Sequence, residues 1–190
     1  MQFQTFFNLK FIISCLYFFL PAYFTNMTPP ILAKKNLFNF LAIRVDFGKK
    51  FLGNDIFGSH KTWRGVIFGL LVGILFSFFQ KFLYQFSFFQ KISLIDYSKI
   101  NILLFGFLIS GGALFGDLLF AFIKRRLKLQ PGAIFFPFDQ INYIIGASIF
   151  LTPIFKIKIE VWFLLLILTP ILHILTTHIG FYLNLTKSKW

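Results

Sequence analysis

Acidic residues are scarce in this sequence: Asp and Glu number 6 among 190 residues, against 19 Lys and Arg, which gives a formal net charge of +13. The single cysteine, Cys15, lies in an apolar run, so a disulfide framework and a cysteine metal cage are both excluded. Of the 3 histidines, His173 and His178 have no carboxylate or cysteine at metal-ligand spacing, and His60 lies in a hydrophilic loop. We therefore expect no histidine metal site.

Apolar residues, in contrast, are abundant. The chain is 57% hydrophobic and 22% aromatic, with 32 Phe, and its mean hydropathy is +0.78. A soluble domain of this size could not bury so much apolar surface, so the composition indicates an integral membrane protein. The basic residues fall between apolar runs, and no basic soluble domain with interleaved aromatic residues is present. We therefore expect no nucleic acid partner; the charge suits an anionic membrane surface and phosphorylated ligands.

Five apolar segments approach the roughly 20 residues that a helix needs to cross a bilayer. They cover residues 11–33, 65–84, 100–123, 141–155 and 161–183. Because the fourth is short and lysines crowd its end, we expect it to begin within the preceding loop or to rely on lysine side chains that reach the interface. The first could instead be a signal peptide, but no small-residue cleavage site follows it. The sequence therefore predicts one all-α integral membrane domain over 1–190, with about five transmembrane helices.

The cations are distributed unequally between the two sides of these spans. The segments 34–64 and 124–140 and the C-terminal tail hold 13 of the 19 Lys and Arg residues. Because positively charged loops stay in the cytoplasm, we predict a multi-pass cell-membrane protein with its N-terminus outside and two functional cytoplasmic loops, 34–64 and 124–140. Four of the acidic residues fall on the same side: Asp46, Asp55, Asp117 and Asp139. The active site is therefore expected to face the cytoplasm.

Small and polar residues recur at helical spacing in three of the predicted spans. In the second span these are Gly65, Gly69, Gly73 and Ser77. In the third they are Gly106, Ser110, Ala113, Asp117, Ala121 and Lys124. In the fifth they are Thr169, His173, Thr176, Thr177, Gly180 and Asn184. We expect these faces to pack inside the bundle, to turn Asp117 inward and, in the fifth span, mainly to hydrogen-bond to other helices.

Two aspartates flank a basic cluster at the water-facing ends of the third and fourth spans. Asp117 precedes the cluster Lys124-Arg125-Arg126, and Asp139 follows the next loop. Charges beside a membrane are costly unless something holds them, and the hairpin connection returns the chain to the same membrane face. Two neighbouring carboxylates would repel, whereas Mg²⁺ takes both as ligands and fills its remaining positions with water and phosphate. We therefore predict that both aspartates bind Mg²⁺; the alternative is that each only pairs with the cations.

A second basic motif, Lys61-Thr62-Trp63-Arg64, stands directly before the second span. Lys61 offers a point charge and Arg64 a planar fork for phosphate oxygens, and the start of the helix offers unpaired N–H groups. Trp63 suits either base stacking or an anchor at the membrane interface. Both cations could simply follow the positive-inside rule, but their close spacing with Thr62 and two glycines favours substrate binding.

Together these motifs resemble the CDP-archaeol synthase family of membrane cytidylyltransferases, distant relatives of CDP-diacylglycerol synthases. The resemblance covers most of the chain and rests on residues 20–23, 26–30, 46–48, 51–53, 61–65, 116–117, 124–126, 132–133 and 139–140, and more loosely on 173–190. The sequence departs from the family at Ala121, where a serine is expected, and at Asn142 and Tyr143, which replace an acidic residue and a phenylalanine. Residues 55–57 also differ.

The resemblance implies transfer of CMP from CTP to a membrane lipid phosphate, giving pyrophosphate and a CDP-lipid of the CDP-archaeol or CDP-diacylglycerol type. Asp117 and Asp139 would hold one or two Mg²⁺ ions. The phosphate clamp would be formed by Lys61, Arg64, Lys124, Arg125 and Arg126, with further substrate contacts from Thr62, Trp63 and Gln140. Because the lipid phosphate is already an ionised nucleophile, no catalytic triad is needed.

Two rival functions stand beside this interpretation. A CDP-alcohol phosphotransferase needs a carboxylate-rich pattern on two helices, and this chain does not contain it. A small non-enzymatic transporter or lipid-binding protein, with its aspartates and arginines in a structural ion-pair cluster, is the alternative. The lipid acceptor, the number of metal ions and the oligomeric state, a homodimer included, stay open at this point.

Overall fold

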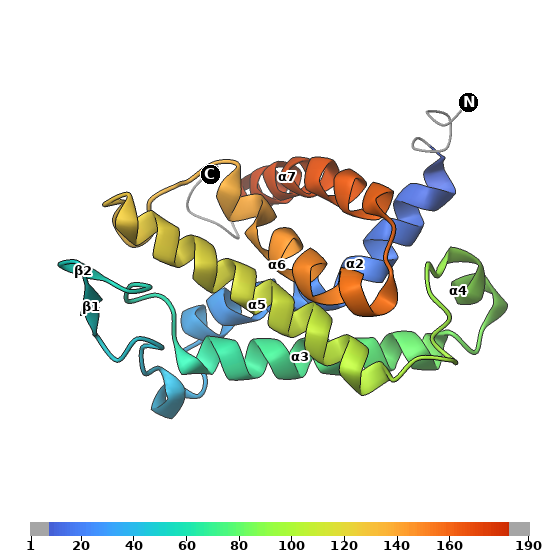
Figure 1. Ribbon diagram of the computed structural model, residues 1–190, viewed down its shortest axis with the longest axis horizontal. Helices are drawn as coiled ribbons and strands as arrows, with labels where there is room; N and C mark the ends of the chain where they lie inside the picture. Colours follow the sequence, from blue (N-terminus) through green and yellow to red (C-terminus); the bar gives the residue numbers. More distant parts are fainter. Residues whose placement is uncertain (1–7, 183–190) are drawn as a thin grey trace.

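The structure, a computed structural model, describes residues 8–182, without the side chains of residues 176, 177 and 179–182. Its helices (Figure 1) are α2 (Leu9–Lys34), α3 (Trp63–Leu83), α4 (Ser87–Ile92), α5 (Ile102–Arg126), α6 (Phe138–Phe155) and α7 (Ile159–Tyr182). The loop between α2 and α3 adds a 3-10 turn, η1 (Asn39–Leu41), and an antiparallel pair of short strands, β1 (Lys50–Phe51) and β2 (Asn54–Asp55). The predicted all-α membrane class is confirmed, with this small hairpin as an addition.

The predicted spans lie within a few residues of the long helices. α6 begins at Phe138, within the predicted loop before the fourth segment, and ends at Phe155; the next residue, Lys156, has a left-handed conformation. Among the described residues, α2, α3 and α5 are long and apolar enough to cross a membrane. α6 carries Asp139 and other polar residues in its first turns and packs against α5. Residue 183, the end of the predicted fifth span, lies outside the described residues.

The small residues of α3 face its neighbours, as predicted. All four members of the stripe are buried. A Cβ atom on Gly73 would lie 2.0 Å from Oγ of Ser110 on α5 and 2.1 Å from Oγ1 of Thr25 on α2, so only glycine allows this approach. α2 and α5 therefore both pack closely on α3, which runs along the lower edge of the molecule in Figure 1.

α5 and α6 cross at glycine residues. A Cβ atom on Gly116 would lie 2.1 Å from the backbone oxygen of Asn142, and one on Gly146 would lie 2.0 Å from the backbone oxygen of Gly112. Since the atoms in the way belong to the backbone, the two helices must touch at their main chains. This crossing brings Asp117, the residue after Gly116, beside the first turns of α6.

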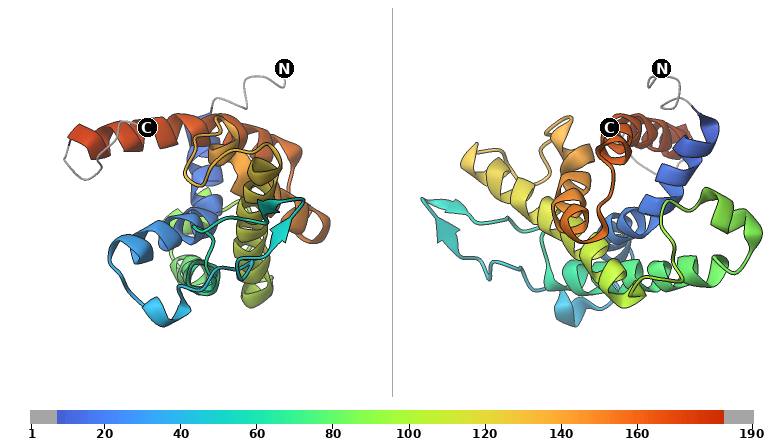
Figure 2. Two further views of the ribbon diagram at one scale, coloured as in Figure 1. Left: turned by 90° about the vertical axis from the view of Figure 1, so that its left-hand side faces the viewer. Right: turned by 45° about the vertical axis from the view of Figure 1, so that its right-hand side comes forward.

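The aromatic core occupies the end of the bundle near α4, away from the hairpin. Buried Phe18 and Phe19 of α2 lie with their ring centroids 6.0 and 6.1 Å from that of Trp162 on α7. The hydroxyl groups of Tyr23 on α2 and Thr169 on α7 are 2.8 Å apart, which confirms hydrogen bonding between helices on the polar face of the fifth span. At the opposite end, Figure 2 shows the hairpin beside the C-terminal end of α5.

Candidate active site

A pocket of about 380 Å³ opens where α5, α6 and α7 meet the loop that leads into α3. From α5 come Asp117, Ala121 and Lys124, whose spacing of four and three residues places them on one helix face. Six of the predicted site residues line the pocket: Lys61, Asp117, Lys124, Arg125, Asp139 and Gln140. The loop that connects α5 and α6 thus brings the two predicted metal ligands to one cavity.

Each of the two aspartates is paired with a lysine. Nζ of Lys61 lies 2.7 and 2.6 Å from the two carboxylate oxygens of Asp117. Nζ of Lys124 lies 3.0 Å from both oxygens of Asp139 and donates to the backbone oxygen of Ala133 at 2.5 Å. The pairing with the basic cluster, which was the alternative to a metal site, is present at Asp139, whereas Asp117 takes its partner from the other loop.

The donor atoms of the pocket fit a magnesium ion. Within residues 8–182 no group of three or more His, Cys, Asp or Glu side chains could hold a metal ion, so two carboxylates are the charged ligands on offer. Magnesium commonly keeps several waters and binds through one or two carboxylates together with substrate phosphates. The carboxyl side chains of Asp117 and Asp139 are 23% and 31% exposed, which leaves them accessible from the pocket.

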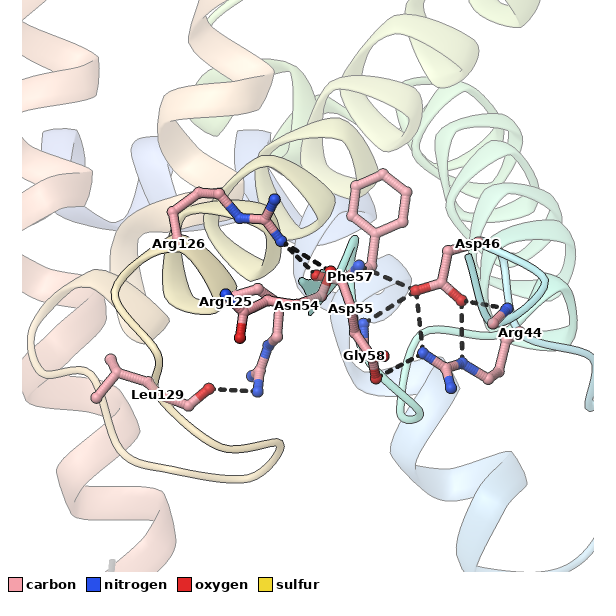
Figure 3. Close-up of polar contacts among 10 residues, drawn as sticks. Arg44, Asp46, Asn54, Asp55, Phe57, Gly58, Arg125, Arg126 and Leu129 are labelled. Carbon is pink, nitrogen blue, oxygen red and sulfur yellow. Dashed lines mark hydrogen bonds and ion pairs between the residues drawn. The ribbon is translucent and has the colours of Figure 1, made fainter. Parts of the chain in front are cut away.

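The three side chains of the basic cluster at the end of α5 point in different directions. Successive helix residues point about 100° apart, so three in a row cannot face one pocket. Lys124 faces the carboxylates, and Arg125 donates from Nη1 to the backbone oxygen of Leu129 while it lines the pocket. Arg126 donates to the backbone oxygens of Phe51 at 2.7 Å and Asp55 at 2.6 Å, so it holds the β1–β2 hairpin to α5. Figure 3 shows its contact with Asp55. The structure places Arg126 outside the pocket, and its catalytic role stays a prediction.

The residues of the basic motif before α3 also differ in where they lie: one enters the pocket and the others do not. Lys61 enters the pocket, whereas Arg64 is buried and donates from Nη1 to the backbone oxygen of Leu37 at 2.9 Å and to Oδ1 of Asn39 at 2.8 Å. The hydroxyl of Thr62 caps α3 by accepting from the backbone N–H of Gly65. Trp63 does not line the pocket, and its ring centroid lies 6.4 Å from that of Phe47. Substrate binding by Thr62, Trp63 and Arg64 stays a prediction.

A network that the sequence did not reveal organises the loop before α3 (Figure 3). Asp46 is 5% exposed, and its Oδ1 accepts from Nε of Arg44 at 2.9 Å and from the backbone N–H of Gly48 at 3.0 Å. Its Oδ2 accepts from Nη2 of Arg44 at 3.2 Å and from the backbone N–H groups of Phe57 at 3.0 Å and Gly58 at 3.2 Å. Nη2 of Arg44 also donates to Asp55 at 2.7 Å. A buried carboxylate thus ties together three parts of one loop.

This network fixes the place of Lys61. The backbone N–H of Gly58 donates to Asp46, and the backbone oxygen of Gly58 accepts from the backbone N–H of Lys61. The backbone oxygen of Lys61 accepts from the backbone N–H of Val45 at 2.9 Å. Arg44 and Thr62 form an antiparallel bridge beside it. Burial opposes ionisation of Asp46, but the hydrogen bonds from Phe57, Gly48 and Arg44 outweigh it and lower the carboxyl pKa below its ordinary value of 3.8.

We expect Asp46→Asn to lower the free energy of unfolding by about 1–3 kcal/mol at pH 7, because the amide nitrogen cannot accept the bonds that Oδ2 accepts. The folded-state pKa is lowered, so the stabilisation is complete well above pH 3.8 and is lost as the pH falls through the folded-state value. The Tm difference between wild type and variant should therefore shrink from pH 7 to pH 3. Equal Tm values at pH 7 would contradict this account.

Three further polar residues line the pocket without having been predicted as site residues. These are His60, Asn142 and His173. Asn142 stands one turn after Asp139 on α6, so the three-residue spacing could have indicated it. The side-chain oxygens Oδ1 of Asn142 and Oε1 of Gln140 are buried and accept no hydrogen bond from the described residues. Both residues line the pocket. Ala121, where the resemblance leads us to expect a serine, lines the same cavity.

The remaining wall of the pocket is apolar. Ile134 and Phe136, in the loop before α6, are 64% and 54% exposed. Ile174 on α7 lines the same cavity. Exposed apolar side chains beside a charged pocket suit a ligand with an anionic head and an apolar tail.

Known proteins resemble this chain over nearly its whole length. The protein-family model described as CarS-like, CDP-archaeol synthase, matches residues 8–190. The CDP-archaeol synthase of Methanococcus maripaludis (strain C7) is 37% identical over 183 residues, which are 96% of this chain and 98% of that protein. The CDP-archaeol synthase of Pyrococcus furiosus is 37% identical over 180 residues, 94% of this chain and 95% of that protein.

One solved structure resembles the fold. It is described as an intramembrane enzyme for archaeal membrane lipids biosynthesis, and it matches with a TM-score of 0.69 over 85% of this chain and 90% of that chain. The two sequences are 21% identical, so this likeness concerns the arrangement of the helices.

Proposed function

Because this chain belongs to the CDP-archaeol synthase family, it is a CTP-dependent cytidylyltransferase that forms a CDP-lipid, and we propose that the pocket at Asp117 and Asp139 is its active site. The observation that carries the proposal is the set of paired charges, Lys61 with Asp117 and Lys124 with Asp139, in one cavity with an apolar wall. The alternative, a non-enzymatic transporter or lipid-binding protein, does not agree with the family.

The residues of the pocket suit displacement at phosphorus. An oxygen of the lipid phosphate forms a bond to the α-phosphorus of CTP, and pyrophosphate leaves with the electron pair of the broken bond. The attacking oxygen is already ionised, so alignment and charge neutralisation are the tasks left to the protein. Lys61, Lys124 and Arg125 line the cavity and supply positive charge for the phosphate oxygens.

Asp117 and Asp139 would hold Mg²⁺, as one ion or two. When bound, the metal supplies a Lewis acid that neutralises charge on the phosphates. Lys61 and Lys124 then have phosphate oxygens as acceptors in place of the carboxylates. Gln140 and Asn142 offer buried amide groups that suit a nucleotide base or sugar.

The acceptor that we propose is a phosphorylated isoprenyl ether lipid. Support comes from the name of the relatives, CDP-archaeol synthase, and from the exposed apolar wall at Ile134 and Phe136. The lipid head would enter the charged part of the pocket while its tails stay outside in the bilayer.

We also propose that the pocket faces the cytoplasm and that the N-terminus lies outside. The basic loops 34–64 and 124–140 both contribute to the pocket, and they carry most of the positive charge.

The test is a transfer assay with the purified protein and CTP labelled at one phosphorus. Label at the α-phosphorus should appear in the lipid and label at the γ-phosphorus in pyrophosphate, both only with Mg²⁺. A panel of isoprenyl ether and acyl ester lipid phosphates identifies the acceptor. Absence of α-label in every lipid, with folded protein and Mg²⁺ present, would refute the proposal.

A further inference from the structure

A second, smaller cavity of about 230 Å³ lies next to the pocket, between the β1–β2 hairpin and the turn that follows α5. Three cations line it: Lys50 on β1, Arg125 near the end of α5, and Lys128 in the turn. Arg125 and Pro131 line both cavities, so the two spaces adjoin at the Arg125 side chain. Neither Lys50 nor Lys128 has a role in the site described above.

The positive charge of the second cavity is not balanced by the protein. Asp55 is the acidic residue among those that line it, and its Oδ2 already accepts from Arg44 at 2.7 Å. Neither Lys50 nor Lys128 forms an ion pair with any described residue. Arg125 is 7% exposed, and its Nε has no hydrogen-bond partner in the part of the chain that the structure describes. This cavity therefore suits a polyanion.

The end of α5 would oppose an anion if its carbonyl groups were unpaired. The chain instead folds back on itself: the backbone N–H of Lys128 donates to the oxygen of Arg125 at 3.1 Å, and that of Leu129 to the oxygen of Lys124 at 3.0 Å. The backbone oxygen of Leu129 in turn accepts from Nη1 of Arg125 (Figure 3). These bonds occupy the carbonyl groups nearest the cavity, so the side-chain cations set its charge.

We propose that this cavity binds the β- and γ-phosphates of CTP and retains them as pyrophosphate after transfer. The inference rests on the proposed function, because it assumes that the lipid oxygen attacks the α-phosphorus near Asp117 and Asp139. The bond that breaks joins the α-phosphorus to the bridging oxygen, which leaves with pyrophosphate and carries its charge. Cations placed on that side stabilise the transition state more than the bound substrate.

The arrangement of the two cavities supports this assignment. The residues of the apolar wall, Ile134, Phe136 and Ile174, line the first cavity and not the second. The lipid head and the leaving group therefore have separate places, as an in-line displacement requires. Arg125, which borders both cavities, stands where the bond between the α- and β-phosphates would lie.

The test is direct binding of labelled inorganic pyrophosphate, with Mg²⁺ at fixed ionic strength, to three purified proteins. They are the wild type, Lys50→Gln/Lys128→Gln, and a control, Lys81→Gln/Lys91→Gln, which removes equal charge from exposed sites at the other end of the molecule. We expect the first variant to bind pyrophosphate about tenfold more weakly and the control to match the wild type. Binding of CMP, which lacks the distal phosphates, should be equal in all three.

Equal pyrophosphate affinity in the two double variants would overturn the inference. So would an equal loss of CMP affinity in Lys50→Gln/Lys128→Gln, since the lysines would then act on the whole site. The two single variants repeat the test if the double variant does not fold. Lysine-dependent pyrophosphate binding without any transfer of CMP to lipid would support the cavity and refute the proposed function.

Discussion

Asp139→Asn protein is expected to transfer CMP about 10²–10³-fold more slowly than the wild type, and Asp117→Asn protein to lose a similar factor. Asparagine keeps the size of the side chain but removes the negative charge that would bind Mg²⁺. It also removes the partner of a lysine: Asp139 accepts from Lys124 with both oxygens, and Asp117 from Lys61. The loss should appear in kcat under saturating CTP, and half-maximal activity should need more Mg²⁺.

Asp96→Asn is the matched control for these two variants. Asp96 lies in the loop between α4 and α5, at the other end of the bundle, and pairs with Lys99 at 3.2 Å. Its replacement removes one carboxylate of the same type without touching the pocket, so kcat and the Mg²⁺ requirement should not change. Wild-type kcat and Mg²⁺ dependence in both Asp117→Asn and Asp139→Asn would end the assignment of the metal site.

Gly116→Ala is expected to lower the free energy of unfolding by about 3 kcal/mol or more. The added Cβ atom would lie 2.1 Å from the backbone oxygen of Asn142, and neither helix can move a main-chain atom away without opening the crossing. Because Asp117 follows directly and Asp139 begins α6, any separation also misplaces the two carboxylates. Activity should therefore fall together with stability.

Gly111→Ala, on the same helix, provides the comparison. A Cβ atom on Gly111 meets nothing within 4 Å, and alanine favours a helix over glycine by about 1 kcal/mol. This variant should be as stable as the wild type or slightly more so. The measurement is thermal unfolding in one detergent, followed by the transfer assay. A Gly116→Ala protein with wild-type Tm would show that the two helices do not touch at their main chains.

Hydrophobicity and helical spacing were sufficient to predict much of this fold. A bilayer crossing requires a long apolar helix, so the long helices could be located without tertiary information. The glycine stripe of α3 and the inward face of α5 followed in the same way, because helical periodicity places residues on faces. The β1–β2 hairpin could not be predicted from the sequence, because strands of two residues leave no periodic pattern.

The residues that line the pocket were predicted only in part. The other predicted cations pair with backbone oxygens of neighbouring loops instead. Lys61, Lys124 and Asp139 meet in the pocket because they stand at helix ends that the chain brings together. Asp117 joins them because it lies on the same face of α5 as Lys124. Arg64 and Arg126 looked equivalent to these lysines by spacing, but each satisfies backbone oxygens of a neighbouring loop. The sequence does not reveal which carbonyl groups a loop leaves unpaired. The same limit hid the role of Asp46, whose partners are mostly backbone N–H groups.

The two lysine–carboxylate pairs have a thermodynamic consequence for the order of ligand entry. A metal ion alone would have to separate Asp117 from Lys61, or Asp139 from Lys124, and leave a lysine without a counter-ion. A triphosphate alone would draw a lysine away from its aspartate and leave that carboxylate without a counter-ion. When both arrive together, every charge finds a partner, so each ligand raises the affinity of the protein for the other. We therefore expect a pocket whose two carboxylates are both paired with lysines to bind the magnesium complex of the nucleotide more tightly than either component alone.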